Sequence, residues 1–105
     1  MKVLFDQGTP VPLRRHLPSH DVATVYDLAW STLQNGALIA RAEAAGFEVL
    51  VTTDQNLKYQ QNLSARRLAV VVLLSTSWPK VQARVAAVVK AVDEATLGSY
   101  TEVAI

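Results

Sequence analysis

One apolar run, residues 68–74, limits what this chain can fold into more than any other feature of the sequence. It reads Leu-Ala-Val-Val-Val-Leu-Leu and shows no alternation of apolar with polar residues, which is typical of a parallel strand covered by helices on both faces. The run is only about a third of the length that spans a bilayer as a helix, so we expect no membrane segment. It therefore predicts a central strand in a sheet of the α/β class.

Composition bounds the rest of the fold. With 105 residues, of which 50% are hydrophobic, the chain can bury one continuous core, and we expect a single domain over residues 1–105. The absence of cysteine excludes disulfides, thiolate metal sites and a cysteine nucleophile. It fits a reducing compartment, and the start of the chain lacks the apolar stretch of a secretory signal. We therefore expect a cytoplasmic protein.

Strands and helices are expected to alternate along the chain. Valines at positions 81, 85, 88, 89 and 92 follow a helical repeat, and Gly46 and Gly98 are placed to end helices. Strands are expected at residues 2–5, 21–25, 48–53, 68–74 and 100–103, and helices at 10–17, 35–45 with Asn35 as its cap, and 79–95, with short helical pieces at 26–31 and 57–62. This order predicts a three-layer α-β-α sandwich with a central, mostly parallel sheet of four to five strands.

Two aspartates are placed where such sheets bind ligands. Ligands bind beyond the carboxyl ends of the strands, where the winding of the chain reverses, and Asp6 and Asp54 directly follow the first and third expected strands. Two carboxylates about 4 Å apart repel by roughly 4 kcal/mol at an effective dielectric near 20, so they must share a proton, meet a basic group or bind a cation. Mg²⁺ suits such a pair, because it is commonly held by one or two carboxylates. An aspartate after a strand is also often simply a turn former, and that interpretation stays open.

The segments around these aspartates resemble a known family. Residues 3–10, Val-Leu-Phe-Asp-Gln-Gly-Thr-Pro, and residues 49–57, Val-Leu-Val-Thr-Thr-Asp-Gln-Asn-Leu, are similar to the two signature strands of the compact PIN-like family called domain of unknown function 5615, which is related to VapC-type toxins. The likeness covers roughly residues 1–75. It implies a PIN-like fold, with Asp6 and Asp54 as catalytic residues and metal ligands. PIN domains with a full acidic set are Mg²⁺- or Mn²⁺-dependent ribonucleases, and relatives are often predicted toxins of toxin-antitoxin pairs.

The chain departs from this family where typical members carry further acids. Gln7 follows the first aspartate, Asn35 and Gly36 open the second helix, and Asn56 follows Asp54. Amides can bind waters, bases or ribose hydroxyls, but they add no charge to hold a metal. We therefore expect cation binding weaker than in a relative with four carboxylates.

Weaker candidates surround the aspartates. Glu43, near the end of the second helix, is a candidate for an acid that supports the metal ligands, although a glutamate on a solvated helix face is commoner. Lys58 and Tyr59 are candidates for a phosphate contact and a base stack, against the simpler interpretation of a solvated lysine and a packed tyrosine. The basic pairs at positions 14–15 and 66–67 would favour RNA only if they flanked the acidic crevice.

These residues support two hypotheses. The first is a divalent-metal-dependent endoribonuclease, a toxin component with an antitoxin protein as partner and RNA as substrate. The second is a catalytically degenerate module that binds RNA or a protein. A formal net charge of +1 leaves both open, because RNA contact would then depend on a local basic cluster. Trp30 and Trp78 are expected at core edges or a dimer face, and a homodimer is expected because PIN-like domains often dimerise.

Overall fold

The computed structural model describes residues 1–57 and 66–105, and its centre is a five-stranded sheet. Every neighbouring pair of strands in this sheet is parallel. The order across the sheet is β2-β1-β3-β4-β5, formed by β1 (Lys2–Phe5), β2 (Asp21–Thr24), β3 (Val49–Thr52), β4 (Ala69–Leu73) and β5 (Tyr100–Val103). The expected strands are all present, and β4, the unalternating apolar run, is fully buried within the sheet.

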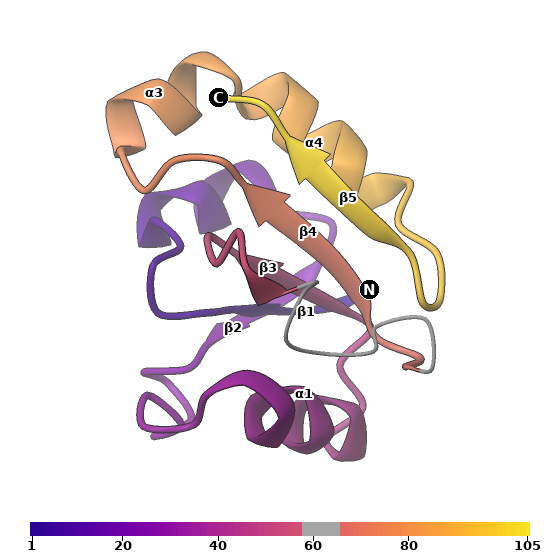
Figure 1. Cartoon of the computed structure of the whole chain (residues 1–105). Helices are drawn as coiled ribbons and strands as arrows, with labels where there is room; N and C mark the ends of the chain where they lie inside the picture. The colour runs from indigo at the N-terminus through magenta and orange to yellow at the C-terminus, as the bar shows by residue number, and fades with distance from the viewer. Residues whose placement is uncertain (58–65) are drawn as a thin grey trace.

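Helices cover both faces of the sheet and confirm the three-layer α/β architecture (Figure 1). The helices are η1, a 3₁₀ helix (Val11–His16), and the α-helices α1 (Asn35–Ala44), α3 (Trp78–Ala83) and α4 (Val85–Asp93). The first face carries η1, α3 and α4, and the second carries α1 (Figure 1).

Alternate residues of each strand build the two halves of the core. Val3 and Phe5 of β1 point into the cluster beneath η1, α3 and α4, whereas Leu4 points into the cluster beneath α1. In β3, Val49 and Val51 point into the cluster beneath η1, α3 and α4, and Leu50 points into the cluster beneath α1. This is the alternation of a pleated strand, with successive side chains on opposite faces. The core is therefore continuous through the sheet.

The winding of the chain reverses at β1. The connection through η1 places β2 on one side of β1, and the connection through α1, on the opposite face, places β3 on the other side. Later strands continue outward from β3. The carboxyl ends of β1 and β3 therefore form the switch point at which open parallel sheets bind ligands.

Two expected helices differ from the structure. The segment after β1 is a 3₁₀ helix of six residues rather than an α-helix over residues 10–17. Pro12 has no N–H to donate, and the amides of Leu13 and Leu17 bond back three residues, to Pro10 and Arg14, at 3.1 Å each. Flanking prolines at positions 10 and 18 leave room only for this short, tight helix.

The long helix expected over residues 79–95 is divided into α3 and α4 at Arg84. The Arg84 backbone has φ −117° and ψ 22°, outside the helical region. Valine has a low intrinsic helix propensity, so packing decides the path of this segment. Val81 before the break and Val88 after it are both fully buried. Both helices therefore contribute a buried valine to the core.

Smaller differences concern segment ends. Residues 26–29 form a turn rather than part of a helical piece, and Ala29 adopts a left-handed φ of 58°. Helix α1 begins at Asn35 itself, with Gln34 as its N-cap, and Gly46 ends it at φ 83° as expected. The expected helical piece at 57–62 lies outside the described residues except for Leu57. Within the described part of the chain, no helix has the length and apolarity needed to cross a membrane.

Candidate active site

The carboxyl ends of β1 and β3 bring Asp6 and Asp54 to the same edge of the sheet. Asp6 directly follows β1, and its N–H donates to the carbonyl of Val51 at 2.9 Å, which extends the pairing of the two strands by one residue. Asp54 is the second residue beyond β3, because this strand ends at Thr52 and not at Thr53 as expected. Both aspartates are half-buried. The convergence predicted from strand ends therefore holds for the backbone.

Thr52 connects the two aspartates. Its hydroxyl donates to Asp6 Oδ2 at 2.9 Å and accepts the backbone N–H of Asp54 at 3.1 Å. A single atom, the Thr52 hydroxyl oxygen, therefore bridges Asp6 Oδ2 and the backbone nitrogen of Asp54. The Thr52 side chain is completely buried and lies in register with the residue after β1, so its position is fixed by the sheet. The structure assigns this residue to the site, whereas the sequence analysis overlooked it.

A signal for Thr52 was present in the sequence. It has the same parity as Leu50 in β3, so it faces the same side of the sheet as Leu4 and the residue that follows β1 by the same alternation. A hydroxyl at the last position of a strand whose other residues are apolar needs a partner when it is buried. The carboxylate of Asp6 is that partner.

The remaining carboxylate bonds are local. Asp6 Oδ1 accepts the N–H of Gln7 at 2.7 Å, and Asp54 Oδ1 accepts the N–H of Asn56 at 3.0 Å. The carbonyl of Asp54 also accepts the N–H of Leu57 at 3.4 Å. Asp54 therefore forms the kind of turn that aspartate favours after a strand. The turn-former interpretation is therefore correct for Asp54. The turn uses Oδ1, and the carboxylate has further lone pairs that could accept a ligand.

The loops after β1 and β3 touch each other. A Cβ atom at Gly8 would lie 2.1 Å from Thr53 Oγ1, so only glycine fits at this position without a shift. The buried Thr9 hydroxyl donates to the carbonyl of Val51 at 2.8 Å, which holds the first loop against β3. These contacts fix the spacing of the loops that carry Asp6 and Asp54.

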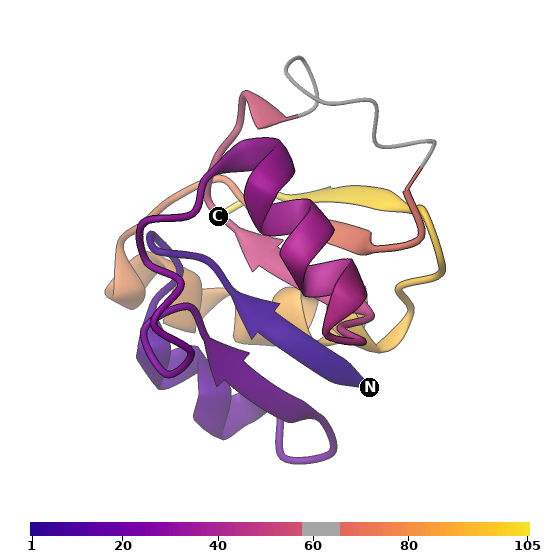
Figure 2. The same ribbon diagram turned by 90° about the horizontal axis from the view of Figure 1, so that it is seen from below.

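Two amide side chains at this edge, those of Gln7 and Asn56, are exposed. Gln7 and Asn56 follow the two aspartates and present their side chains to solvent. Helix α1 runs antiparallel to the strands, so Asn35, its first residue, also lies toward the carboxyl edge (Figure 2). The backbone therefore brings Gln7, Asn35 and Asn56 to one edge of the sheet. Lys58 and Tyr59, the two remaining substrate-binding candidates, lie outside the described residues.

Glu43 lies at the opposite edge and not beside the aspartates. It is near the end of α1, and its Oε2 accepts the N–H groups of Arg67, at 2.7 Å, and Leu68, at 3.2 Å, just before β4 begins. Arg66 Nη1 pairs with Oε1 at 3.2 Å. Burial raises the pKa of this carboxyl, but the hydrogen bonds from Arg67, Leu68 and Arg66 outweigh it and leave the pKa below its usual value. Glu43 is thus an anchor for β4.

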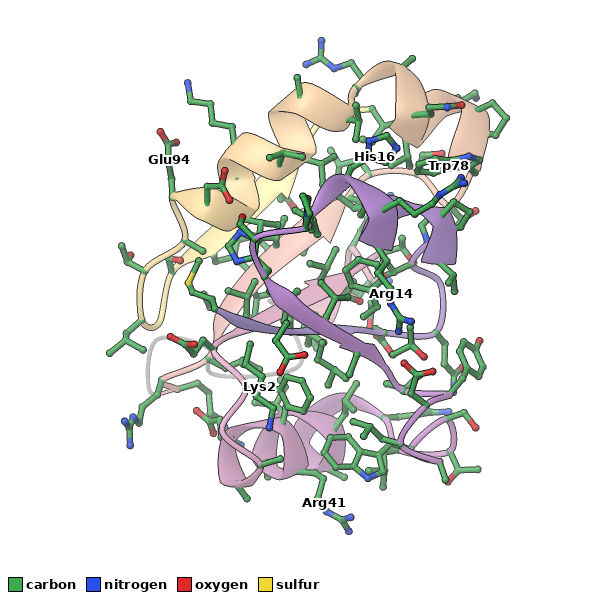
Figure 3. All side chains as sticks on the ribbon, turned by 180° about the vertical axis from the view of Figure 1, so that it is seen from behind. Lys2, Arg14, His16, Arg41, Trp78 and Glu94 are labelled. Carbon is green, nitrogen blue, oxygen red and sulfur yellow. The ribbon has the colours of Figure 1, made fainter. Side chains whose placement is uncertain are left out.

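The basic pairs are divided between the two edges. Arg66 and Arg67 lie with Glu43 at the amino edge, away from the aspartates. Arg14 reaches from η1 toward the carboxyl end of β2, where its Nη2 binds the carboxylate of Asp27 (Figure 3). The pKa of Asp27 is lowered by the hydrogen bond from the Thr24 backbone and by Arg14. Of these four arginines, Arg14 is therefore the one that the described contacts place at the carboxyl edge, and its charge is balanced there by Asp27.

The histidines and tryptophans make packing and polar contacts that do not involve the two aspartates of the site. His16 packs against Trp78 with ring centroids 5.8 Å apart, which joins η1 to the start of α3 (Figure 3). His20, in the turn before β2, contacts Asp93 at 2.6 Å and has only 8% of its side chain exposed. Trp30 packs edge-on against Phe47 at 6.0 Å, at the margin of the core beneath α1. The core-edge prediction for Trp30 and Trp78 is confirmed.

The donor set suits a hydrated, hard cation better than a fully caged one. Among residues 1–57 and 66–105, no three histidine, cysteine or acidic side chains are grouped so that they could hold a metal ion. The Asp6 carboxylate lies beside the Thr52 hydroxyl, and Asp54, whose backbone N–H binds the same hydroxyl, supplies a second carboxylate at this edge, so all the side-chain donors are oxygens. Mg²⁺ commonly keeps several waters and takes one or two carboxylates, so these residues fit Mg²⁺ or the similar Mn²⁺.

Comparison with models of protein families, with curated proteins and with solved structures finds no match for this chain. The fold and the site therefore rest on the geometry of the chain itself. They define an all-parallel α/β sandwich with an acidic pair at its switch point.

Proposed function

We propose that this chain is a divalent-metal-dependent endoribonuclease of the PIN-like type, in which Asp6 and Asp54 hold Mg²⁺ or Mn²⁺. The observation that carries the proposal is the Thr52 hydroxyl, which ties the carboxylate of Asp6 to the backbone of Asp54 at the switch point of the sheet. The resemblance of residues 1–75 to the PIN-like family supports the same role for these two aspartates.

The protein residues contribute position and charge. Thr52 and the Gln7 N–H orient the Asp6 carboxylate, and the Asn56 N–H orients that of Asp54. A bound Mg²⁺ or Mn²⁺ supplies an activated water and neutralises charge on a phosphodiester oxygen. The amides of Gln7 and Asn56 add no negative charge, so cation binding is weaker than with four acids.

The biological setting belongs to the same proposal. We infer an RNA substrate, a toxin-like role with an antitoxin protein as partner, a homodimeric state and a cytoplasmic location. The family resemblance supports the first three of these, and the absence of cysteine is consistent with the last.

A second function is a catalytically degenerate module that keeps the fold and binds RNA or a protein. One observation favours it. Both oxygens of Asp6 already accept hydrogen bonds from within the chain, from the Gln7 N–H and the Thr52 hydroxyl. A carboxylate held in this way has a structural role even without a cation.

Cleavage of single-stranded RNA separates the two functions. We expect wild-type protein to cut a labelled RNA in Mg²⁺ or Mn²⁺ and to stop on addition of a chelator. Asp6→Asn and Asp54→Asn should lose this activity. Asp21→Asn is the matched control, since Asp21 is an exposed aspartate at the amino end of β2.

Activity that survives in both site variants would come from a contaminant or from another site, and it would refute the proposal. The absence of cleavage by the wild type, with RNA binding intact, would support the degenerate module instead.

A further inference from the structure

The loops on either side of Asp6 expose large apolar side chains. In the described part of the chain, four large hydrophobic residues are exposed: Val11, Tyr26, Leu28 and Leu97. Val11 begins η1 just after β1, and Tyr26 and Leu28 lie in the turn just after β2. Because β1 and β2 are parallel neighbours, these three residues share the carboxyl edge with Asp6.

The turn that carries Tyr26 is held in one shape. Asp27 accepts the Thr24 N–H at 3.0 Å, its own N–H donates to the Thr24 hydroxyl at 3.1 Å, and Arg14 binds its carboxylate. The turn closes with the Trp30 N–H on the Val25 carbonyl at 2.7 Å. Ala29 has a left-handed φ of 58° there. Such strain persists only where the surroundings fix it, and it is concentrated at functional sites.

Tyr26 is connected to the acidic site through Gln7. Its hydroxyl donates to the Gln7 carbonyl at 3.2 Å, and the Gln7 N–H donates to Asp6 Oδ1 at 2.7 Å. The side chain is nevertheless 57% exposed. The hydroxyl therefore holds the end of the side chain at the Gln7 backbone, next to Asp6 in the sequence, while the ring stays open to solvent.

We propose that Tyr26 is the base-stacking residue of the site, binding a nucleobase of single-stranded RNA next to the phosphodiester at Asp6. This inference rests on the proposed ribonuclease function. An aromatic ring accepts any base, because every base has a π-face. The exposed Arg15, on η1, offers positive charge of the kind that an RNA backbone needs, whereas the charge of Arg14 is balanced by Asp27.

Binding measured without metal tests the stack separately from catalysis. A fluorescein-labelled single-stranded RNA is titrated with protein in a chelating buffer, and anisotropy gives Kd. Tyr26→Ala should raise Kd by about 5- to 100-fold, as expected for the loss of one base stack. Tyr26→Phe keeps the ring but loses the hydrogen bond to the Gln7 carbonyl, so its Kd should rise less than that of Tyr26→Ala. Leu97→Ala, another exposed apolar residue, is the matched control and should not change Kd.

An abasic oligonucleotide of the same length keeps the phosphates but offers no base. Wild type and Tyr26→Ala should bind it equally. Unchanged Kd in Tyr26→Ala, an equal loss on the abasic strand, or no RNA binding by the wild type would each overturn the stacking role.

The two proposals fail in different ways. RNA that binds through Tyr26 but is never cut refutes the nuclease and keeps the stack. RNA that is cut in Mg²⁺ with the same KM by wild type and Tyr26→Ala refutes the stack and keeps the nuclease.

Discussion

Glu43 and Glu48 at the amino edge of the sheet have different kinds of partners from Asp6 and Asp54 at the carboxyl edge. At the amino edge, Glu43 pairs with Arg66 and accepts two backbone N–H groups, and Glu48 accepts the N–H of Lys2 at 3.0 Å. At the carboxyl edge, Asp6 and Asp54 receive only neutral donors, and within residues 1–57 and 66–105 neither has an ion pair. Glu43 uses its charge to hold the fold, whereas Asp6 and Asp54, unlike their neighbour Asp27, carry charge that no basic side chain among the described residues balances.

This difference separates stability from function. An acid that is paired and hydrogen-bonded contributes to folding, and its removal leaves donors unsatisfied. Acids without a basic partner contribute less to folding, and chains retain such groups where they serve a site. We therefore expect substitution of Glu43 to lower stability and substitution of Asp54 to leave it almost unchanged.

The largest effect is expected from Glu43→Ala. It leaves the N–H groups of Arg67 and Leu68 and the charge of Arg66 without their acceptor, at a cost of about 3 kcal/mol. Urea unfolding followed by circular dichroism measures the change, and Glu43→Gln, which keeps an acceptor oxygen, should lose less. A loss below about 0.5 kcal/mol for Glu43→Ala would show that Glu43 does not stabilise the fold and would contradict the comparison of the two edges.

The same residue gives the fold a dependence on pH. The pKa of Glu43 is lower in the folded chain than its ordinary value of 4.5, so its contribution is complete above that value and is lost as the pH falls through the folded pKa. The difference in unfolding free energy between wild type and Glu43→Gln should therefore shrink on acidification below about pH 4.5. A difference that stays constant from neutral to acid pH would contradict this assignment.

Gly8→Ala is expected to have an intermediate effect. The new Cβ would overlap Thr53 Oγ1 and push apart the loops that carry Asp6 and Asp54, at a cost of about 1 to 2 kcal/mol. The double variant Gly8→Ala with Thr53→Ala removes the overlapping atom and should recover most of the loss in a thermal melt. Equal stability of the single and double variants would show that the loops are not in contact.

The smallest effect is expected from Asp54→Asn. The amide oxygen can still accept the Asn56 N–H, so the unfolding free energy should change by less than about 0.5 kcal/mol. Chemical denaturation beside Glu43→Ala gives the comparison directly. A loss as large as that of Glu43→Ala would mean that Asp54 is primarily a structural turn residue.

Most of the fold was predictable from local patterns. The unalternating run at residues 68–74 gave a buried parallel strand, and the alternation of strands and helices gave the three layers. The positions of Asp6 and Asp54 at one edge followed from the ends of two strands. These predictions succeeded because strand parity and strand ends are properties of short segments.

The rest depended on partners distant in sequence. The role of Thr52 becomes visible only when Asp6 is known to lie opposite it across the β1–β3 pair. From the sequence, Glu43 is predicted to lie beside the aspartates. A crossover helix runs antiparallel to the strands that it connects, so the last turn of α1, which carries Glu43, lies at the amino edge. The break at Arg84 has no local signal, because packing of Val81 and Val88 decides it.

Calorimetric titration with Mn²⁺ tests the central claim most directly. We predict stoichiometric binding to the wild type and to Asp21→Asn, and its loss in Asp6→Asn and in Asp54→Asn, because the proposed cation site lies between the carboxyl ends of β1 and β3. Asp54→Asn that binds Mn²⁺ as tightly as the wild type, or a wild type that binds none up to millimolar concentration, would contradict the account.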